Sequence, residues 1–372
     1  MMFSSLPAPK PRLESLPNEL LDQILSYLVT EPPSSTRFHA TPSAQVVRSE
    51  TRDLKNFSLV SSRLLATVRP YLFTHVCFDL GYEASVASFI EQWGLARYVV
   101  SLVVTVSAPS TRGDPLWWQR VLRYLDPQRI LVVAAPQLLG KMLGAEVLET
   151  HGWAFDIPLQ ALQLEKNHRV SDPSLLAPLD PQRNLLSARP WESLSFNESS
   201  SLKAYNHYEY FLLNVPSAFD RWAALSSSTS LAAPQDLAAA LSLHRLTRFS
   251  YTAVFPFYNH VGLVLEVVKM MSSLRSFAVQ LAPGRNDNII EIEQRGSLDP
   301  SDPWMELYTG YSLIAHVVRE RWHKGHLRRF ESRDFAIEAL QEELSVILVD
   351  VLEQDGWVHD GNGAWSKQSR II

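Results

Sequence analysis

The sequence predicts an α+β fold class, with a small N-terminal three-helix module followed by an irregular α/β solenoid and a C-terminal cap. Two apolar helical stretches, separated by a segment rich in Pro and Ser, fill most of the first 80 residues. Short apolar triplets then recur, with helix-like stretches between them. An amphipathic helix and a hairpin signal end the chain.

The composition bounds the class of protein. The chain has 372 residues, of which 46% are hydrophobic, and its net charge is −5. Such a chain can bury a large core, and its acidic balance disfavours a nucleic-acid-binding surface. Its single cysteine, Cys77, excludes an internal disulfide framework and a multi-cysteine zinc site. We find no signal-peptide pattern and no long apolar run, so we expect an intracellular protein without a membrane span.

The stretch LPNELLDQILSYL (16–28) has the pattern of an amphipathic helix. Pro17 suits the first helical position, where its missing N–H needs no partner. One apolar stripe follows from the spacing of Leu20, Leu21, Ile24, Leu25 and Leu28. Residues 1–12 and 30–50 are expected to be flexible because they are rich in Pro and Ser. Helical spacing resumes at 53–73, and 74–80 reads as a strand.

Three patterns follow one another in this region. They are Leu16-Pro17-x-Glu19-Leu20-Leu21-x-x-Ile24-Leu25-x-Tyr27-Leu28, then Leu54-x-x-Phe57-Ser58-Leu59-Val60-Ser61-x-Arg63-Leu64, then Pro70-x-Leu72-Phe73. Together they resemble the F-box of fungal-type F-box proteins, over about a sixth of the chain. The resemblance implies a small helical module that docks on the Skp-type adaptor of an SCF-type cullin-RING ubiquitin ligase. One departure is the loop of roughly two dozen residues between the first two helices.

The resemblance also implies which residues meet the adaptor, although the sequence does not separate contact residues from the module's own core. The implied adaptor-binding residues are Leu16, Pro17, Leu20, Leu21, Ile24, Leu25, Leu59, Val60 and Leu64.

The remaining 300 residues or so carry a faint repeat, in which an apolar residue, two spacers, a second apolar residue, one spacer and a third apolar residue follow one another. The central positions are 102, 130, 162, 194, 249, 277 and 330, at separations of 28, 32, 32, 55, 28 and 53. A period near 28 with one short strand per unit is typical of leucine-rich repeats. Helix-like stretches lie between the strands, at 114–125, 208–215, 234–243, 260–271 and 310–322. An ordinary α/β domain remains the alternative, because its strand–helix alternation produces similar spacing and the asparagine ladder of strong leucine-rich repeats is absent.

The last 40 residues or so differ from this repeat. Residues 335–357 read as a long amphipathic helix, and the segment from Trp357 to Trp365 carries Asp-Gly and Asn-Gly pairs between aromatic residues, which indicates a hairpin. These elements would cap a solenoid.

We find no motif for catalysis or cofactor binding, so we expect no catalytic residue, cofactor or metal. Cys77 is a possible nucleophile, but a buried small apolar side chain is the simpler interpretation. Two groups of possible metal ligands are better explained as a basic helix end and a surface loop: His316, His323 and His326, and Asp299, Asp302 and Glu306.

The sequence thus predicts a flexible N-terminus (1–12), an F-box (13–78) with an inserted loop at about 29–52, and a leucine-rich-repeat-like target-binding domain (79–372). We expect a cytoplasmic and/or nuclear substrate-recognition subunit that holds the Skp-type adaptor, and through it a cullin, and also a protein target. The concave face of the sheet and the loop at 283–303 are the expected target site. The alternatives are a scaffold without a ligase role and an enzyme in the C-terminal domain.

Overall fold

The structure is a computed structural model, and it describes residues 13–29, 32, 37–43, 51–106, 113–170, 176, 178–180, 183–227, 234–284, 287, 289–290, 299–323 and 327–367. The N-terminus at 1–12, most of the loop at 30–50 and much of 283–303 therefore lie outside the described residues.

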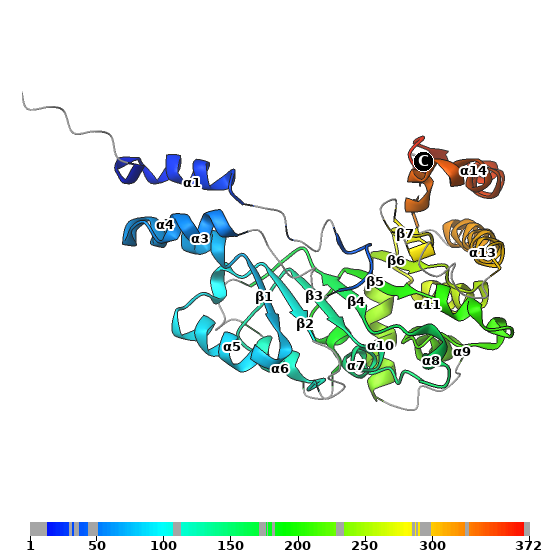
Figure 1. Ribbon diagram of the computed structural model, residues 1–372, viewed down its shortest axis with the longest axis horizontal. Coiled ribbons are helices and arrows are strands. Elements are labelled where there is room, and N and C mark those ends of the chain that lie inside the picture. Colours follow the sequence, from blue (N-terminus) through cyan, green and yellow to red (C-terminus); the bar gives the residue numbers. More distant parts are fainter. Residues whose placement is uncertain are drawn as a thin grey trace, which may run out of the picture.

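A ten-stranded sheet runs through the described part of the chain (Figure 1), in the order β1-β2-β3-β4-β5-β6-β7-β8-β10-β9. Most neighbours are parallel. However, β4 is antiparallel to β3 and β5, and β10 is antiparallel to β8 and β9. The strands are β1 (His75–Asp79), β2 (Ser101–Thr105), β3 (Arg129–Ala134), β4 (Gln160–Glu165), β5 (Ser193–Ser200), β6 (Arg248–Val254), β7 (Ser276–Gln280), β8 (Arg329–Ser332), β9 (Val358–His359) and β10 (Ala364–Ser366).

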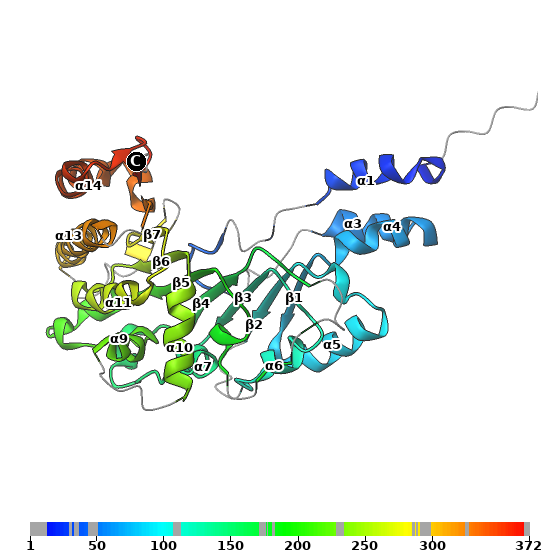
Figure 2. The same cartoon turned by 180° about the vertical axis from the view of Figure 1, so that it is seen from behind.

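Most helices cover one face of this sheet, and α1, α3 and α4 lie beyond its β1 end (Figures 1 and 2). The helices are α1 (Asn18–Ser26), α3 (Arg52–Ser58), α4 (Ser62–Leu72), α5 (Glu83–Gln92), α6 (Trp117–Val121), α7 (Pro136–Leu143), α8 (Gly152–Phe155), α9 (Phe219–Ser227), α10 (Pro234–Arg245), α11 (Tyr258–Met270), α13 (Asp302–His323) and α14 (Glu338–Leu352).

The main core lies between the sheet and these helices. One row of paired residues crosses the sheet and points into this core, because alternate residues of a strand face opposite sides. Phe249 and Phe277 stack within the row at a centroid distance of 5.7 Å. Each such side chain contributes roughly 1.5–3 kcal/mol by leaving water. The row is Val76, Leu102, Ile130, Leu164, Leu194, Phe249, Phe277, Phe330 and Trp365.

The predicted fold class is wrong. The chain is an α/β protein with one mostly parallel sheet, and its described residues show neither a separate small three-helix module nor a leucine-rich-repeat solenoid. Phe73, the C-cap residue of α4, packs on Phe89 of α5 and against the main core, and β1 begins two residues later. The strands of a solenoid all run in one direction, whereas β4 is reversed. The α/β alternative is the interpretation that the structure supports.

The strand positions, by contrast, are confirmed. All seven central positions of the apolar triplets lie in strands β2 to β8, and the expected strand at 74–80 is β1. The C-terminal hairpin is confirmed as β9 and β10, which are paired antiparallel. The helix expected at 208–215 is wrong, since that stretch holds only a 3-10 turn at Tyr210–Leu212.

Candidate functional site

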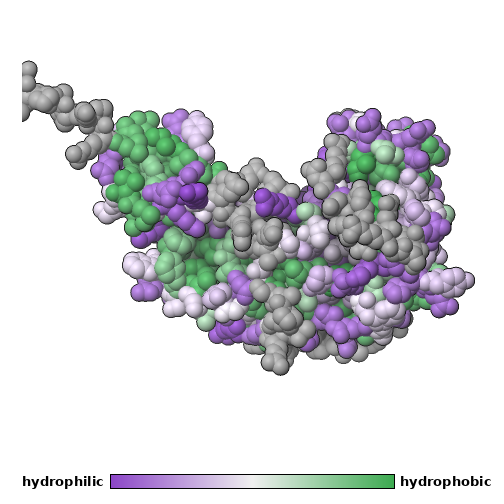
Figure 3. Space-filling model, viewed as in Figure 1, coloured by the Kyte–Doolittle hydropathy of each residue, from purple (hydrophilic) through white to green (hydrophobic). Residues whose placement is uncertain are grey.

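Apolar side chains gather on the surface over α1, α3 and α4 (Figure 3). Leu59 is 83% exposed and Val60 is 66% exposed, in the turn between α3 and α4, and Leu20 on α1 is 46% exposed. We call Pro17, Leu20, Leu59 and Val60 the N-terminal apolar surface. Exposed apolar residues concentrated in one region are typical of binding sites.

The structure separates the residues that the resemblance implies for adaptor binding. The four of the N-terminal apolar surface are exposed, and Leu16 and Ile24 are half-buried. Leu21, Leu25 and Leu64 are fully buried, so they hold the helices together and do not present a free surface. Leu25 packs with Leu54 and Val68, which joins α1, α3 and α4.

Arg63 of α4 holds the start of α1 in place. Its guanidinium donates to the carbonyl oxygens of Glu14 and Leu16, and to the side-chain oxygen of Asn18 at 3.0 Å. It therefore positions Pro17 beside the α3–α4 turn. Arg63 belongs to the quoted pattern, but the sequence assigns it no role. Two of its partners are backbone carbonyls, and a pattern of side chains does not identify such partners.

The face of the sheet that points away from the main core is a second candidate surface. Among the described residues, its β2–β4 part carries an apolar cluster of Val103, Leu131, Val133 and Ala161, with the buried Gln163 of β4 beside Leu131. A polar and charged row runs along one edge of this face and includes an Arg129–Glu165 ion pair of 2.6 Å. The row is His75, Ser101, Arg129, Glu165, Ser193, Arg248, Ser276 and Arg329.

A segment of the chain itself, Arg37–Ser43, lies against this second face. Phe38 is 3% exposed and packs in the apolar part of the face. The imidazole Nδ1 of His39 lies 2.7 Å from the hydroxyl of Thr252 in β6. Part of the loop expected to be flexible at 30–50 is therefore packed on the sheet, which its Pro and Ser content does not reveal.

Asn197 of β5 holds the backbone of this segment. Its amide Nδ2 donates to the carbonyl oxygens of Phe38, at 2.7 Å, and of Ala40, at 2.9 Å. Its Oδ1 accepts from the backbone N–H of Ser199 at 2.9 Å, which fixes the orientation of the amide. Asn197 is 2% exposed, so both amide hydrogens depend on these carbonyls for partners.

The loop expected to bind the target is only partly described. Thr41 donates to Asp287 at 3.2 Å, so one described residue of 283–303 meets the segment on the second face. Glu306 accepts from the backbone N–H of Tyr258, at the start of α11, and Asp299 accepts from Ser301. These carboxylates therefore stabilise local structure. The side chain of His323 and all of His326 lie outside the described residues.

A buried ionised cluster surrounds Glu198 of β5, next to Asn197. Its carboxylate lies 2.7 Å from Nε2 of His260 and accepts from the hydroxyls of Tyr251 and Ser217. Burial alone would raise the pKa of Glu198, but the charge of His260 and these hydrogen bonds lower it. Burial would lower the pKa of His260, but Glu198 and Asp220 raise it. Ser217 is fully buried, so this cluster anchors β5 and offers no accessible nucleophile.

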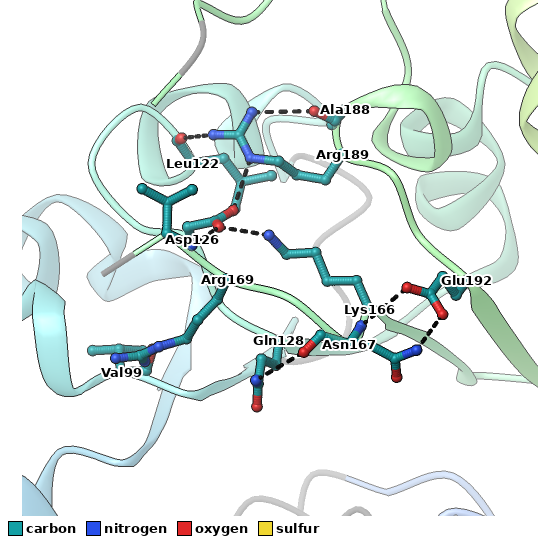
Figure 4. Close-up of polar contacts among 11 residues, drawn as sticks. Val99, Leu122, Asp126, Gln128, Lys166, Asn167, Arg169, Ala188, Arg189 and Glu192 are labelled. Carbon is teal, nitrogen blue, oxygen red and sulfur yellow. Dashed lines mark hydrogen bonds and ion pairs between the residues drawn. The ribbon is translucent and has the colours of Figure 1, made fainter. Parts of the chain in front are cut away.

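A second buried cluster joins the ends of β4 and β5 (Figure 4). Asp126 accepts from Nζ of Lys166 at 2.6 Å, from Nε of Arg189 at 3.1 Å and from the backbone N–H of Val170 at 2.6 Å. Burial lowers the pKa of Lys166, against the raising effect of Asp126, and the charges of Arg189 and Arg169 lower it further. All three charged side chains are less than 10% exposed, so they tie loops together inside the fold.

Cys77 lines a groove of about 780 Å³ between β1, α4 and α5. Burial raises the pKa of its thiol to about 11, which disfavours the reactive thiolate at neutral pH. Within the described ranges, no group of three or more His, Cys, Asp or Glu side chains could hold a metal ion. No helix in that part of the chain is long and apolar enough to cross a membrane.

Comparison with known proteins identified no matching family model, no similar curated protein and no similar solved structure.

Proposed function

We propose that this protein is a non-catalytic substrate-recognition subunit of an SCF-type cullin-RING ubiquitin ligase. In this proposal the N-terminal apolar surface binds the Skp-type adaptor, and through it a cullin, while the α/β part of the chain holds a protein target. Such a subunit acts by raising the effective concentration of the target near the conjugating enzyme. A cytoplasmic and/or nuclear location belongs to the proposal.

The observation that carries the proposal is the exposure of Leu59 and Val60 at 83% and 66%, in the stretch whose residues resemble the F-box. Burial of one such side chain at an interface is worth roughly 1.5–3 kcal/mol. A few anchors of this kind supply most of the affinity of a protein interface. Arg63 supports the proposal because it holds α1 and the α3–α4 turn together before any partner binds.

The buried clusters around Glu198 and Asp126 lend no support to the enzyme alternative. Both bring titratable groups together, but each lies inside the fold, where a substrate has no access.

Co-purification with the Skp-type adaptor tests the proposal. The full chain should bind, and the double variant Leu59→Asp/Val60→Asp should lose binding by at least a hundredfold. Val346→Asp is the matched control, because Val346 is 61% exposed on α14, a helix at the opposite end of the sheet from β1 (Figure 1). No binding by the unaltered chain, or equal binding by the double variant, would overturn adaptor binding through this surface.

The alternative is a scaffold that binds the adaptor without supporting ubiquitination. The same exposed residues would serve it, so adaptor binding does not separate the two. Target-dependent ubiquitination by the reconstituted complex does, since only a substrate-recognition subunit would support it.

A further inference from the structure

We propose that the second face of the sheet is a peptide-binding surface that the chain's own residues 37–43 occupy. Its external ligand is a peptide segment that forms a turn, as residues 37–40 do through the bond from the Ala40 N–H to the Arg37 carbonyl oxygen, and that carries an aromatic anchor followed by a hydrogen-bonding side chain. The inference rests on the proposed function only in taking this ligand to be part of the target.

The main argument is the way in which Asn197 meets the segment. Its amide donates to two backbone carbonyls, those of Phe38 and Ala40, and to no side chain of the segment. A contact with two backbone carbonyls serves any segment that forms the same turn and has suitable side chains, because it does not depend on the identity of the residues that supply the carbonyls. Because Asn197 is buried and its Oδ1 is held by Ser199, an empty face would leave two amide hydrogens without protein acceptors.

Two further contacts define the side chains that the face accepts. The apolar patch formed by Val103, Leu131, Val133 and Ala161 takes the ring of Phe38. Thr252 then meets the imidazole of the next residue, His39. The face therefore selects an aromatic residue followed by a polar one and holds the backbone on either side.

The segment belongs to the long connection between the end of α1 at Ser26 and the start of α3 at Arg52. A tethered occupant competes with an external peptide through its effective concentration, and tethers of a few residues typically give values of the order of millimolar. An external ligand must displace residues 37–43, so the unaltered chain binds it more weakly than a chain whose own segment has lost its anchors.

The test uses a fluorescent peptide with the sequence of residues 37–43, RFHATPS, and the full-length protein. The double variant Phe38→Ala/His39→Ala should bind this peptide at least tenfold more tightly than the unaltered chain. The peptide RAHATPS, which lacks the aromatic anchor, should bind neither protein. Asn197→Asp in the double-variant background keeps an acceptor for Ser199 but removes both donors, and it should abolish peptide binding.

Three results would overturn the proposal. The first is a folded double variant that binds no peptide, which would make residues 37–43 a structural cover. The second is equal binding by the unaltered chain. The third applies if the double variant fails to fold, and it comes from hydrogen exchange in the unaltered chain. If the amides of residues 37–43 exchange only through global unfolding, the segment is not a displaceable occupant. None of these results depends on the adaptor, and loss of adaptor binding by Leu59→Asp/Val60→Asp leaves peptide binding unaffected.

Discussion

Replacing Glu198 with glutamine should strongly destabilise the fold, because it removes the charge from a buried ion pair while it nearly keeps the volume. Oε2 of Glu198 accepts from both Tyr251 and His260, at 2.6 and 2.7 Å. A glutamine offers one oxygen and a donor in place of two acceptors, so at least one buried partner loses its acceptor. Removal of one partner of a buried pair costs roughly 3–5 kcal/mol.

The pH dependence of this loss follows from the two pKa shifts. The pKa of His260 is raised, so its contribution to stability is present below 6.5 and is lost as the pH rises through the raised value. The pKa of Glu198 is lowered, so its contribution is present above 4.5 and is lost as the pH falls through the lowered value. The pair therefore contributes most between pH 4.5 and 6.5.

Urea unfolding followed by tryptophan fluorescence measures the difference between the unaltered chain and Glu198→Gln across this range. The difference should be largest between pH 4.5 and 6.5 and should shrink above it. Ser226→Ala on α9 is a control that touches no member of the cluster. A loss below about 1 kcal/mol at pH 6, or a loss that does not change with pH, would refute the reasoning.

Three other predictions follow from single positions. Burial and the charge of Arg333 lower the pKa of His39 to about 3. The packing of residues 37–43 on the sheet should therefore become less stable as the pH falls below 6.5. Hydrogen exchange should show this as faster exchange of the amides of residues 37–43 relative to the rest of the chain. The pKa of Cys77, raised to about 11 from 9.0, should slow iodoacetamide labelling about a hundredfold at pH 7.5 relative to the chain in urea, and a rate equal in both would contradict it. Gly363 has a φ of 90°, and an added Cβ would lie 2.5 Å from the carbonyl oxygen of Ser332. In urea unfolding, Gly363→Ala should therefore lower the stability of the fold by about 2 kcal/mol or more. Gly361→Ala is the control and should cost less, because its Cβ would meet open space.

Local pattern determined where most strands lie. Leu102, Phe249 and Phe277 sit at the centres of apolar triplets, and each lies in a strand because alternate apolar residues bury one face of a sheet. The hairpin near Trp365 was predictable for a similar reason, since Asn-Gly pairs favour the positive φ that tight turns require. The start of α1 was predicted to within one residue, since Pro17 is the N-cap and Asn18 is the first helical residue.

The direction of β4 was decided only in the tertiary structure. Ile130 pairs with Leu164, and Leu164 pairs with Leu194, because β4 runs against both neighbours. An apolar triplet reads almost the same in either direction, so its period cannot separate a solenoid from an α/β sheet. For this reason the sequence predicted a solenoid where the structure has an α/β sheet.

The sequence by itself therefore determined local elements, a Leu- and Val-rich N-terminal region and the resemblance from which adaptor binding is proposed. Only the tertiary structure decided which of those apolar residues are exposed, since Leu20 and Leu21 are neighbours in the chain but are 46% and 0% exposed. It alone brought Phe38 to the second face of the sheet and Asn197 to the backbone of that segment, 159 positions apart. Contacts over such separations depend on how the elements pack, and no local period of the sequence encodes them.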